Sequence, residues 1–129
     1  MPGPLDAAPA SLKTGAAARS RALGRTGENL AAAWYLDAGF MIAERNWRCD
    51  SGEIDLVCVR GRTLVFCEVK ARSGLGYGAP AEAVGRAKQQ RLRRLAARYL
   101  AESGRHGVTV RFDVASVLEG QLEVVTGAF

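Results

Sequence analysis

Apolar residues recur at helical spacing between residues 26 and 38, where they lie three or four positions apart. Thr26 is suited to cap the start of a helix there, and Gly39 to end it. Residues 1–22, by contrast, hold three of the four prolines and few large apolar side chains. They are predicted to form a flexible tail, because they bury too little apolar surface to offset the entropy of ordering.

Strand-like runs follow this helix. Residues 40–47 are the first, and residues 48–52 are predicted to form a loop. Two short β-rich runs at 53–59 and 64–70 are separated by four residues that include Gly61, which can take the positive φ of a tight turn. These two runs are therefore predicted to pair as a β-hairpin.

A long helix is predicted after a glycine-rich loop, with Pro80 in its first turn and Gly104 and Gly107 at its end. One face of this helix is apolar, and it carries Leu92, Leu95, Ala96 and Tyr99. That face is expected to pack against a sheet.

Two further strands are predicted at 108–118 and 121–125, joined by a turn at Glu119–Gly120. The predicted order is then α-β-β-β-α-β-β, which indicates an α/β fold with a mixed β-sheet flanked by helices. With 129 residues the chain is long enough for one domain, which is predicted to span residues 23–129.

Composition narrows the class of protein. Hydrophobic residues make up 48% of the chain and charged residues 24%, which is the balance of a globular domain. No apolar run reaches the roughly 18 residues that a membrane helix needs, and the N-terminus lacks the apolar centre of a secretory signal. A cytoplasmic location without a membrane partner is therefore expected.

The cysteines and the histidine argue against several chemistries. Cys49, Cys58 and Cys67 form no CxxC pair, so we expect three reduced thiols and neither a disulfide framework nor a zinc site. The single histidine, His106, leaves no Ser/His/Asp or Cys/His set, which argues against the hydrolases that depend on one.

The formal net charge is +5, and all of the excess lies between residues 79 and 105, where seven basic residues stand against two acidic ones. Such a concentration is typical of a protein with a polyanionic partner, and DNA is the expected one. A basic helix face that serves only solubility explains the same charge distribution equally well.

The hairpin brings charged residues together. With a turn at Gly61–Arg62, Asp55 faces Glu68 across the two strands. The same register places Glu53 opposite Lys70, and alternation puts all four on one face. The opposite face is predicted to be apolar and buried, and it carries Ile54, Leu56, Cys58, Val65, Cys67 and Val69.

Opposed carboxylates repel each other and destabilise a sheet unless a cation neutralises them. Mg²⁺, or Mn²⁺ in its place, prefers oxygen ligands, so Asp55 and Glu68 are the predicted metal ligands. Lys70 could orient an attacking water or neutralise charge that develops on a phosphate. Asp55 is also unfavourable within a strand, which indicates that a function offsets its cost. For Glu53 and Lys70 a cross-strand ion pair is the alternative.

Four segments resemble the bacterial YraN-like family of predicted endonucleases, and they are residues 27–28, 52–57, 66–73 and 111–114. The match covers roughly residues 24–118. That family is similar to Holliday junction resolvases of the PD-(D/E)XK nuclease superfamily. The resemblance implies a restriction-endonuclease-like fold and Mg²⁺-dependent cleavage of DNA, although Ile54 stands where the superfamily motif has its proline.

Carried onto this chain, the resemblance implies that Asp55 and Glu68 are the metal-binding catalytic acids and Lys70 the catalytic lysine. Glu28 would match a glutamate of the first helix that completes such sites in resolvases. An acid in the first turn of a helix is also favoured by the helix dipole alone, so both explanations of Glu28 stand. Because related resolvases act as symmetric dimers, a homodimer is a further expectation.

Five residues are predicted to contact nucleic acid, and they are Arg72, Ser73, Lys88, Arg91 and Arg94. Lys88 lies on the inward face of the long helix, where its ammonium either reaches a phosphate near the site or stays in water. Arg91 and Arg94 share an outward stripe with Arg98, which suits contacts with a nucleic-acid backbone or solubility. Asp113 is expected to have a structural role.

These features together predict a metal-dependent endonuclease that hydrolyses phosphodiester bonds of DNA, with branched or damaged DNA in repair or recombination as candidate substrates. The alternative is a nucleic-acid-binding module with a degenerate nuclease site. A third class, a protein-interaction domain, predicts weak DNA affinity that does not depend on salt.

Overall fold

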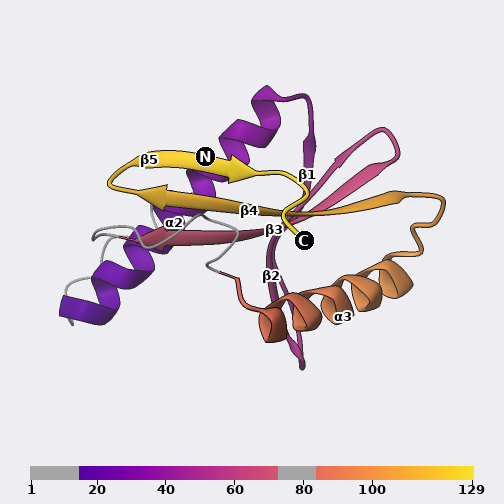
Figure 1. Ribbon diagram of the computed structural model, residues 1–129, viewed down its shortest axis with the longest axis horizontal. Coiled ribbons are helices and arrows are strands. Elements are labelled where there is room, and N and C mark those ends of the chain that lie inside the picture. The colour runs from indigo at the N-terminus through magenta and orange to yellow at the C-terminus, as the bar shows by residue number, and fades with distance from the viewer. Residues whose placement is uncertain (1–14, 73–83) are drawn as a thin grey trace.

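The computed structural model describes residues 15–72 and 84–129, and only the backbone of residues 15–24 and 72. Its elements follow the predicted order (Figure 1). They are helix α2 (Gly15–Asp37), strands β1 (Met41–Cys49), β2 (Gly52–Arg60) and β3 (Thr63–Arg72), helix α3 (Arg86–Ser103), and strands β4 (Thr109–Leu118) and β5 (Gln121–Val125). None of the helices in these ranges is long and apolar enough to cross a membrane.

The five strands form one mixed sheet in the order β1-β2-β3-β4-β5. The central strand β3 is antiparallel to β2 and parallel to β4, and the two outer pairs are antiparallel. A parallel neighbour requires a crossover connection, and α3 lies in the connection from β3 to β4. The predicted α/β fold with a mixed sheet flanked by helices is confirmed.

Each helix covers one face of the sheet. Side chains alternate between the two faces along each strand, so the core has two parts. The core on the α3 side consists of Ile54, Val57, Leu64, Phe66, Val84, Leu92, Leu95, Ala96, Tyr99, Phe112 and Val114. The core on the α2 side consists of Ala31, Ala32, Tyr35, Phe40, Leu56, Cys58, Val65, Cys67 and Ala115. The central strand is therefore buried on both faces, which gives its sequence a continuous apolar run.

One prediction about these faces is wrong. Ile54 does not share a core with Leu56, as regular alternation along β2 requires, but lies in the core on the α3 side. Pairing between β2 and β3 extends only to Leu56, so the start of β2 is held by β1 alone and turns toward α3. The approach is close, since a Cβ added at Gly52 would lie 3.3 Å from Cδ1 of Leu95.

Helix α2 begins earlier than predicted. It starts at Gly15 and not at Thr26, so residues 15–22 of the predicted tail are helical. The rest of that tail, residues 1–14, lies outside the described residues. Alanine and arginine are frequent between 15 and 25, and their helix propensity outweighs the capping signal at Thr26.

Other boundaries also shift. Helix α3 begins at Arg86, because the backbone of Gly85 is extended, whereas the predicted first turn at Pro80 lies outside the described residues. The helix ends as predicted at Gly104, whose left-handed backbone donates its N–H to the Leu100 carbonyl. The predicted loop at 48–52 is shorter than expected, since β1 runs through Cys49 and β2 starts at Gly52.

The three cysteines are free, as predicted. Cys58 and Cys67 are buried, and Cys49 is half-buried. Burial raises the pKa of the Cys58 thiol to about 12, and it raises the pKa of Cys67 as well. Neither buried thiol is therefore ionised near neutral pH, and both act as small apolar side chains.

Helix α2 packs closely on β3 at Gly27. A Cβ added at this position would lie 3.1 Å from the Cβ of Ala71 and 3.3 Å from Cγ1 of Val69. The Cβ of Ala71 is attached directly to the β3 backbone, so it cannot rotate out of the way. The missing side chain of Gly27 thus sets the spacing between α2 and the sheet, next to Glu28.

Replacing Gly27 by valine should force α2 away from β3. We expect Gly27→Val to lower the free energy of unfolding by about 2 kcal/mol, measured by urea denaturation. The matched control is Ala33→Val, which places the same side chain at an exposed position of α2 and should cost less than about 1 kcal/mol. Equal losses for the two variants would contradict a packing limit at Gly27.

Candidate functional site

The predicted hairpin register is confirmed over the paired length of β2 and β3. Arg60 is opposite Thr63, and pairing continues until Leu56 is opposite Cys67. Asp55 is the next residue of β2, and its carboxylate accepts a hydrogen bond from the backbone N–H of Val69, with 2.8 Å between Oδ2 and N. The side chain of Asp55 thus takes the place of a backbone pair where the strands separate.

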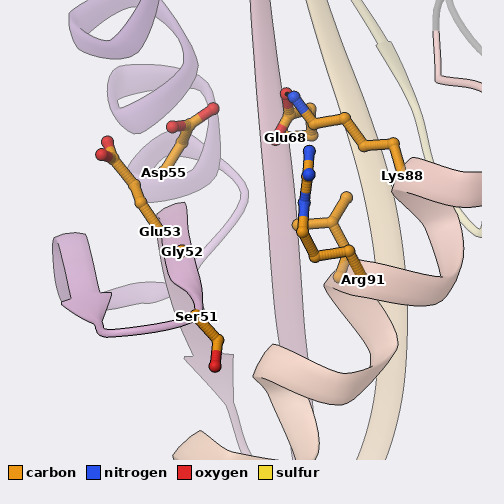
Figure 2. A pocket seen from close by; sticks show the side chains of 8 residues that line it. Ser51, Gly52, Glu53, Asp55, Glu68, Lys88 and Arg91 are labelled. Atoms are coloured by element: carbon orange, nitrogen blue, oxygen red, sulfur yellow. Dashed lines mark ion pairs between the residues drawn. The ribbon is translucent and has the colours of Figure 1, made fainter.

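A pocket of about 270 Å³ opens at this separation. It is lined by Ser51, Gly52, Glu53, Asp55, Glu68, Lys88, Arg91 and Leu92. Figure 2 shows the acidic side chains coming from β2 and β3, and Lys88 and Arg91 extending from α3 toward Glu68. The structure therefore brings Asp55 and Glu68 together and faces them with cations of the basic helix.

Glu68 is the more buried of the two acids, with 7% of its side chain exposed. The ammonium of Lys88 lies 2.7 Å from its Oε2 atom. A buried carboxylate is costly unless it is paired, and Lys88 is its only salt-bridge partner in the described part of the chain. The ammonium of Lys88 therefore lies at the pocket, where it contacts Glu68, and its contact with a phosphate stays a prediction.

The negative charge of Asp55 is less well compensated than that of Glu68. Burial, followed by the negative charge of Glu68, raises the pKa of Asp55 to about 7. The hydrogen bond from Val69 acts in the opposite direction, but the charges of Glu28 and Glu53 raise the pKa further. No cationic side chain pairs with Asp55 among the side chains that the structure describes, which are those of residues 25–71 and 84–129.

Helix α2 supplies a further acid, Glu28, whose side chain is 15% exposed. Its carboxylate accepts a hydrogen bond from Nδ2 of Asn46 at 3.0 Å and lies 3.8 Å from the guanidinium of Arg45. Its charge acts on the pKa of Asp55, which places it near the pocket. Because α2 begins at Gly15, Glu28 is not in a first helical turn, and the helix dipole does not explain its position.

The predicted contact between Glu53 and Lys70 is not formed. Glu53 lies opposite Arg48 of β1 and accepts a hydrogen bond from its Nε at 3.1 Å. The cross-strand ion pair is thus made with β1, because β2 and β3 are no longer paired at Glu53.

Lys70 is half-buried and does not line the pocket. It follows Glu68 by two residues on the same side of β3, a separation of about 6.6 Å along a strand. That distance is within the reach of a lysine side chain, so Lys70 lies beside the pocket and not in its wall.

The residues predicted to contact nucleic acid have three outcomes. Lys88 and Arg91 line the pocket, and Arg94 lines a hollow beside it. Arg72 is the last residue of β3, and its side chain is not described, whereas Ser73 lies outside the described residues.

The sequence analysis missed the part of the pocket that the β1–β2 turn provides. Ser51 and Gly52 line it together with Leu92, although 40 positions separate Gly52 from Leu92. The only signal in the sequence was Gly52 itself, whose φ of 145° lies in a region that side-chain-bearing residues rarely adopt.

The donor set suits a hard divalent cation. Among the described residues, no three His, Cys, Asp or Glu side chains are grouped so that they could hold a metal by themselves. Mg²⁺, however, is usually held by one or two carboxylates, while water and substrate phosphate complete its shell. Asp55 and Glu68 provide such a pair, and Lys88 shows that a cation is already accommodated at Glu68.

The sequence comparison identifies the family. The chain matches the model of "Uncharacterised protein family UPF0102" over residues 27–117. The chain belongs to the UPF0102 family. This is the YraN-like family, so the resemblance seen in the sequence is confirmed.

Several relatives match over most of their length. A UPF0102 protein of Rhodococcus jostii is 51% identical over 117 residues, which cover 87% of this chain and 99% of that protein. A UPF0102 protein of Beutenbergia cavernae is 56% identical over 97 residues, or 75% of this chain and 82% of the relative. A UPF0102 protein of Moorella thermoacetica is 48% identical over 115 residues, which cover 84% of this chain and 96% of that protein.

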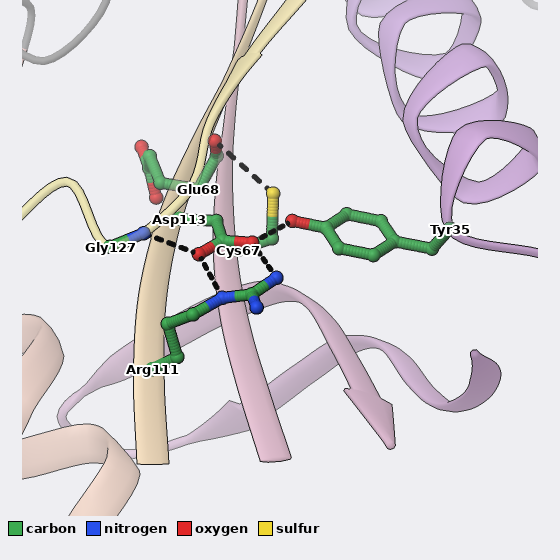
Figure 3. A network of polar contacts seen from close by, with 6 residues as sticks. All are labelled: Tyr35, Cys67, Glu68, Arg111, Asp113 and Gly127. Atoms are coloured by element: carbon green, nitrogen blue, oxygen red, sulfur yellow. Dashed lines mark hydrogen bonds and ion pairs between the residues drawn. The ribbon is translucent and has the colours of Figure 1, made fainter. Parts of the chain in front are cut away.

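A buried polar network lies on the face of the sheet opposite Glu68 (Figure 3), and its three side chains Tyr35, Arg111 and Asp113 fall within the region that matches the UPF0102 model. Asp113 is fully buried and accepts a hydrogen bond from the hydroxyl of Tyr35 at 2.5 Å. It also accepts two from the guanidinium of Arg111, each at 2.9 Å, and one from the N–H of Gly127 at 3.0 Å. Asp113 thus joins α2, β4 and the segment after β5.

This network positions the helix that carries Glu28. Tyr35 follows Glu28 by seven residues, which is two turns of α2, so both lie on the same side of the helix. Asp113 is paired with Cys67 across β3 and β4, next to Glu68. In this UPF0102 protein, a structural role for Asp113 therefore accounts for all of its contacts.

The raised pKa of Asp55 should make stability depend on pH. The folded protein holds this proton up to about pH 7, whereas an unfolded aspartate loses it at about pH 4. Between these values the folded state binds more protons, so the free energy of unfolding falls as the pH rises. Urea denaturation of the metal-free protein should show this decline, and Asp55→Asn should reduce it.

The control for this measurement is Glu44→Gln, which changes an exposed carboxylate on β1 and should leave the decline unaltered. A pH profile of Asp55→Asn that matches the wild type would contradict the assignment.

Proposed function

We propose that this protein is a metal-dependent endonuclease that hydrolyses phosphodiester bonds of DNA. The observation that carries the proposal is the pocket that Asp55 and Glu68 line together with Lys88 and Arg91 of α3. The raised pKa of Asp55 supports it, because burial and the charge of Glu68 make this carboxylate costly to ionise, and a bound cation would offset that cost. The basic helix is suited to a polyanionic substrate.

Asp55 and Glu68 would hold the divalent ion, with Glu28 near Asp55. Bound there, Mg²⁺ or Mn²⁺ would neutralise the two carboxylates and stabilise negative charge that develops on the phosphate during hydrolysis. Arg91 also lines the pocket, where its guanidinium can bind phosphate oxygens in a two-pronged contact and orient the scissile group. Lys70, beside the pocket, is placed to orient the attacking water or to stabilise the same charge.

Two observations favour a second candidate, a nucleic-acid-binding module with a degenerate site. Lys88 already neutralises Glu68, and Lys70 does not line the pocket. A protein that only binds DNA needs neither a free Glu68 nor Lys70. The two candidates differ in whether substitution of Asp55 and Lys70 removes an activity.

The nuclease proposal predicts cleavage that needs both the metal and these residues. Labelled duplex, single-stranded, flap and four-way-junction DNAs are incubated with Mg²⁺ or Mn²⁺ and with each variant. We expect Asp55→Ala and Lys70→Ala to lower the rate by at least about a hundredfold. The exposed Glu44→Ala should cleave like the wild type. Salt-dependent binding of DNA without cleavage under all conditions would instead favour the binding module.

The ion pair of Lys88 predicts competition with the metal. A divalent ion must displace the ammonium from Glu68, so its removal should tighten metal binding. We expect Lys88→Met, which keeps the apolar stem, to raise the affinity for Mn²⁺ about tenfold, or about 1.4 kcal/mol, measured by electron paramagnetic resonance without DNA.

The matched control for Lys88→Met is Arg86→Met, which removes an exposed charge two residues earlier and should leave the affinity for Mn²⁺ unchanged. An unchanged or weaker affinity in Lys88→Met would show that Lys88 does not compete with a metal at Glu68.

A further inference from the structure

A second hollow of about 210 Å³ lies beside the pocket of Asp55 and Glu68. It is lined by Ser51, Arg91, Arg94, Leu95 and Arg98. Ser51 and Arg91 line both spaces, so the two are continuous along α3 and the β1–β2 turn. Three guanidinium groups thus meet in a recess that adjoins the candidate active site, and none of the described acidic side chains lines it.

The arginines form a row on one side of α3. Arg91, Arg94 and Arg98 are spaced by three and four positions, which places them on one face of a helix. With a rise of 1.5 Å per residue, the row is about 10 Å long. Lys88 precedes it by one turn, at Glu68, so cations extend from the carboxylates along the helix.

Only one end of this row is neutralised. Arg98 is paired with Asp50 and with Glu102. Arg91 and Arg94, by contrast, have no acidic partner in the described part of the chain. The part of the row nearer the candidate active site therefore has two guanidinium groups without an acidic partner among the described residues, and their planar forks match the geometry of phosphate oxygens.

We propose that this hollow binds a backbone phosphate of the same nucleic-acid strand whose scissile phosphodiester lies at Asp55 and Glu68. This inference rests on the proposed nuclease function. Phosphates of one strand are about 3.4 Å apart along a duplex axis, so a row of about 10 Å reaches within about three nucleotides of the scissile bond. Arg91 joins the two phosphates, and Arg94 holds the second one.

The test measures binding and not cleavage. Affinity of the full chain for a fluorescent oligonucleotide is measured by anisotropy in EDTA over a series of salt concentrations. We expect Arg94→Gln to lower the slope of log affinity against log salt by about one, because one phosphate contact is lost. Arg62→Gln removes an equal, exposed charge in the turn between β2 and β3 and should keep the wild-type slope.

Three further arms define the ligand. Arg94→Lys retains the charge but not the planar fork, so it should keep the slope and lose part of the affinity. The affinity of the wild type should increase as oligonucleotides lengthen from one to five phosphates. The affinity of Arg94→Gln should stop increasing at a shorter oligonucleotide. If a 5′-phosphate strengthens binding of the wild type but not of Arg94→Gln, the ligand of the hollow is a terminal phosphate. If it strengthens binding of both proteins equally, the ligand is an internal phosphate.

Equal slopes for Arg94→Gln and Arg62→Gln would overturn the inference, even if the wild type cleaves DNA. A lower slope for Arg94→Gln alone would support the phosphate site, even if the cleavage assay is negative and the nuclease proposal fails. The two proposals can therefore fail separately.

Discussion

Repulsion between carboxylates shapes the site and the strands around it. Regular pairing of β2 and β3 ends at Leu56 and Cys67, directly before the acids Asp55 and Glu68. Beyond that point the protein satisfies the acids individually, with a backbone N–H on Asp55 and an ammonium on Glu68. The opening of the hairpin and the pocket are therefore one feature, because opposed carboxylates disfavour continued pairing.

Helix α3, which supplies the cations at the pocket, is held in place by its apolar face. Leu92, Leu95 and Tyr99 of α3 are buried against the sheet, which fixes the rotation of the helix about its axis. Lys88 and Arg91 are thereby directed at the pocket. Hydrophobic packing thus decides which of the many basic residues of α3 line the pocket.

On the other face of the sheet, α2 is positioned by two constraints of different kinds. Gly27 lets the helix approach β3, and the hydrogen bond from Tyr35 to the buried Asp113 ties it to β4. A buried carboxylate with four hydrogen bonds is costly to move, since each lost partner leaves a polar group unsatisfied. The position of Glu28 next to Asp55 depends on both constraints.

The amino-acid sequence by itself determined the order of the elements, the register of the hairpin and the meeting of Asp55 and Glu68 at one place. These features rest on local patterns, namely alternation along a strand and a glycine in a tight turn, so they need no knowledge of distant contacts. The family was also evident from short motifs. Helix starts were less certain, because capping signals are weak compared with the helix propensity of a long segment.

Only the tertiary structure decided which residues meet across the pocket. Three features depend on where the strands separate and how α3 lies on them. They are the pairing of Lys88 with Glu68, the approach of Ser51 to α3 and the position of Ile54 in the core on the α3 side. Each of these features involves residues from different helices and strands. Their meeting is set by packing of the whole core, which no local pattern in the sequence records.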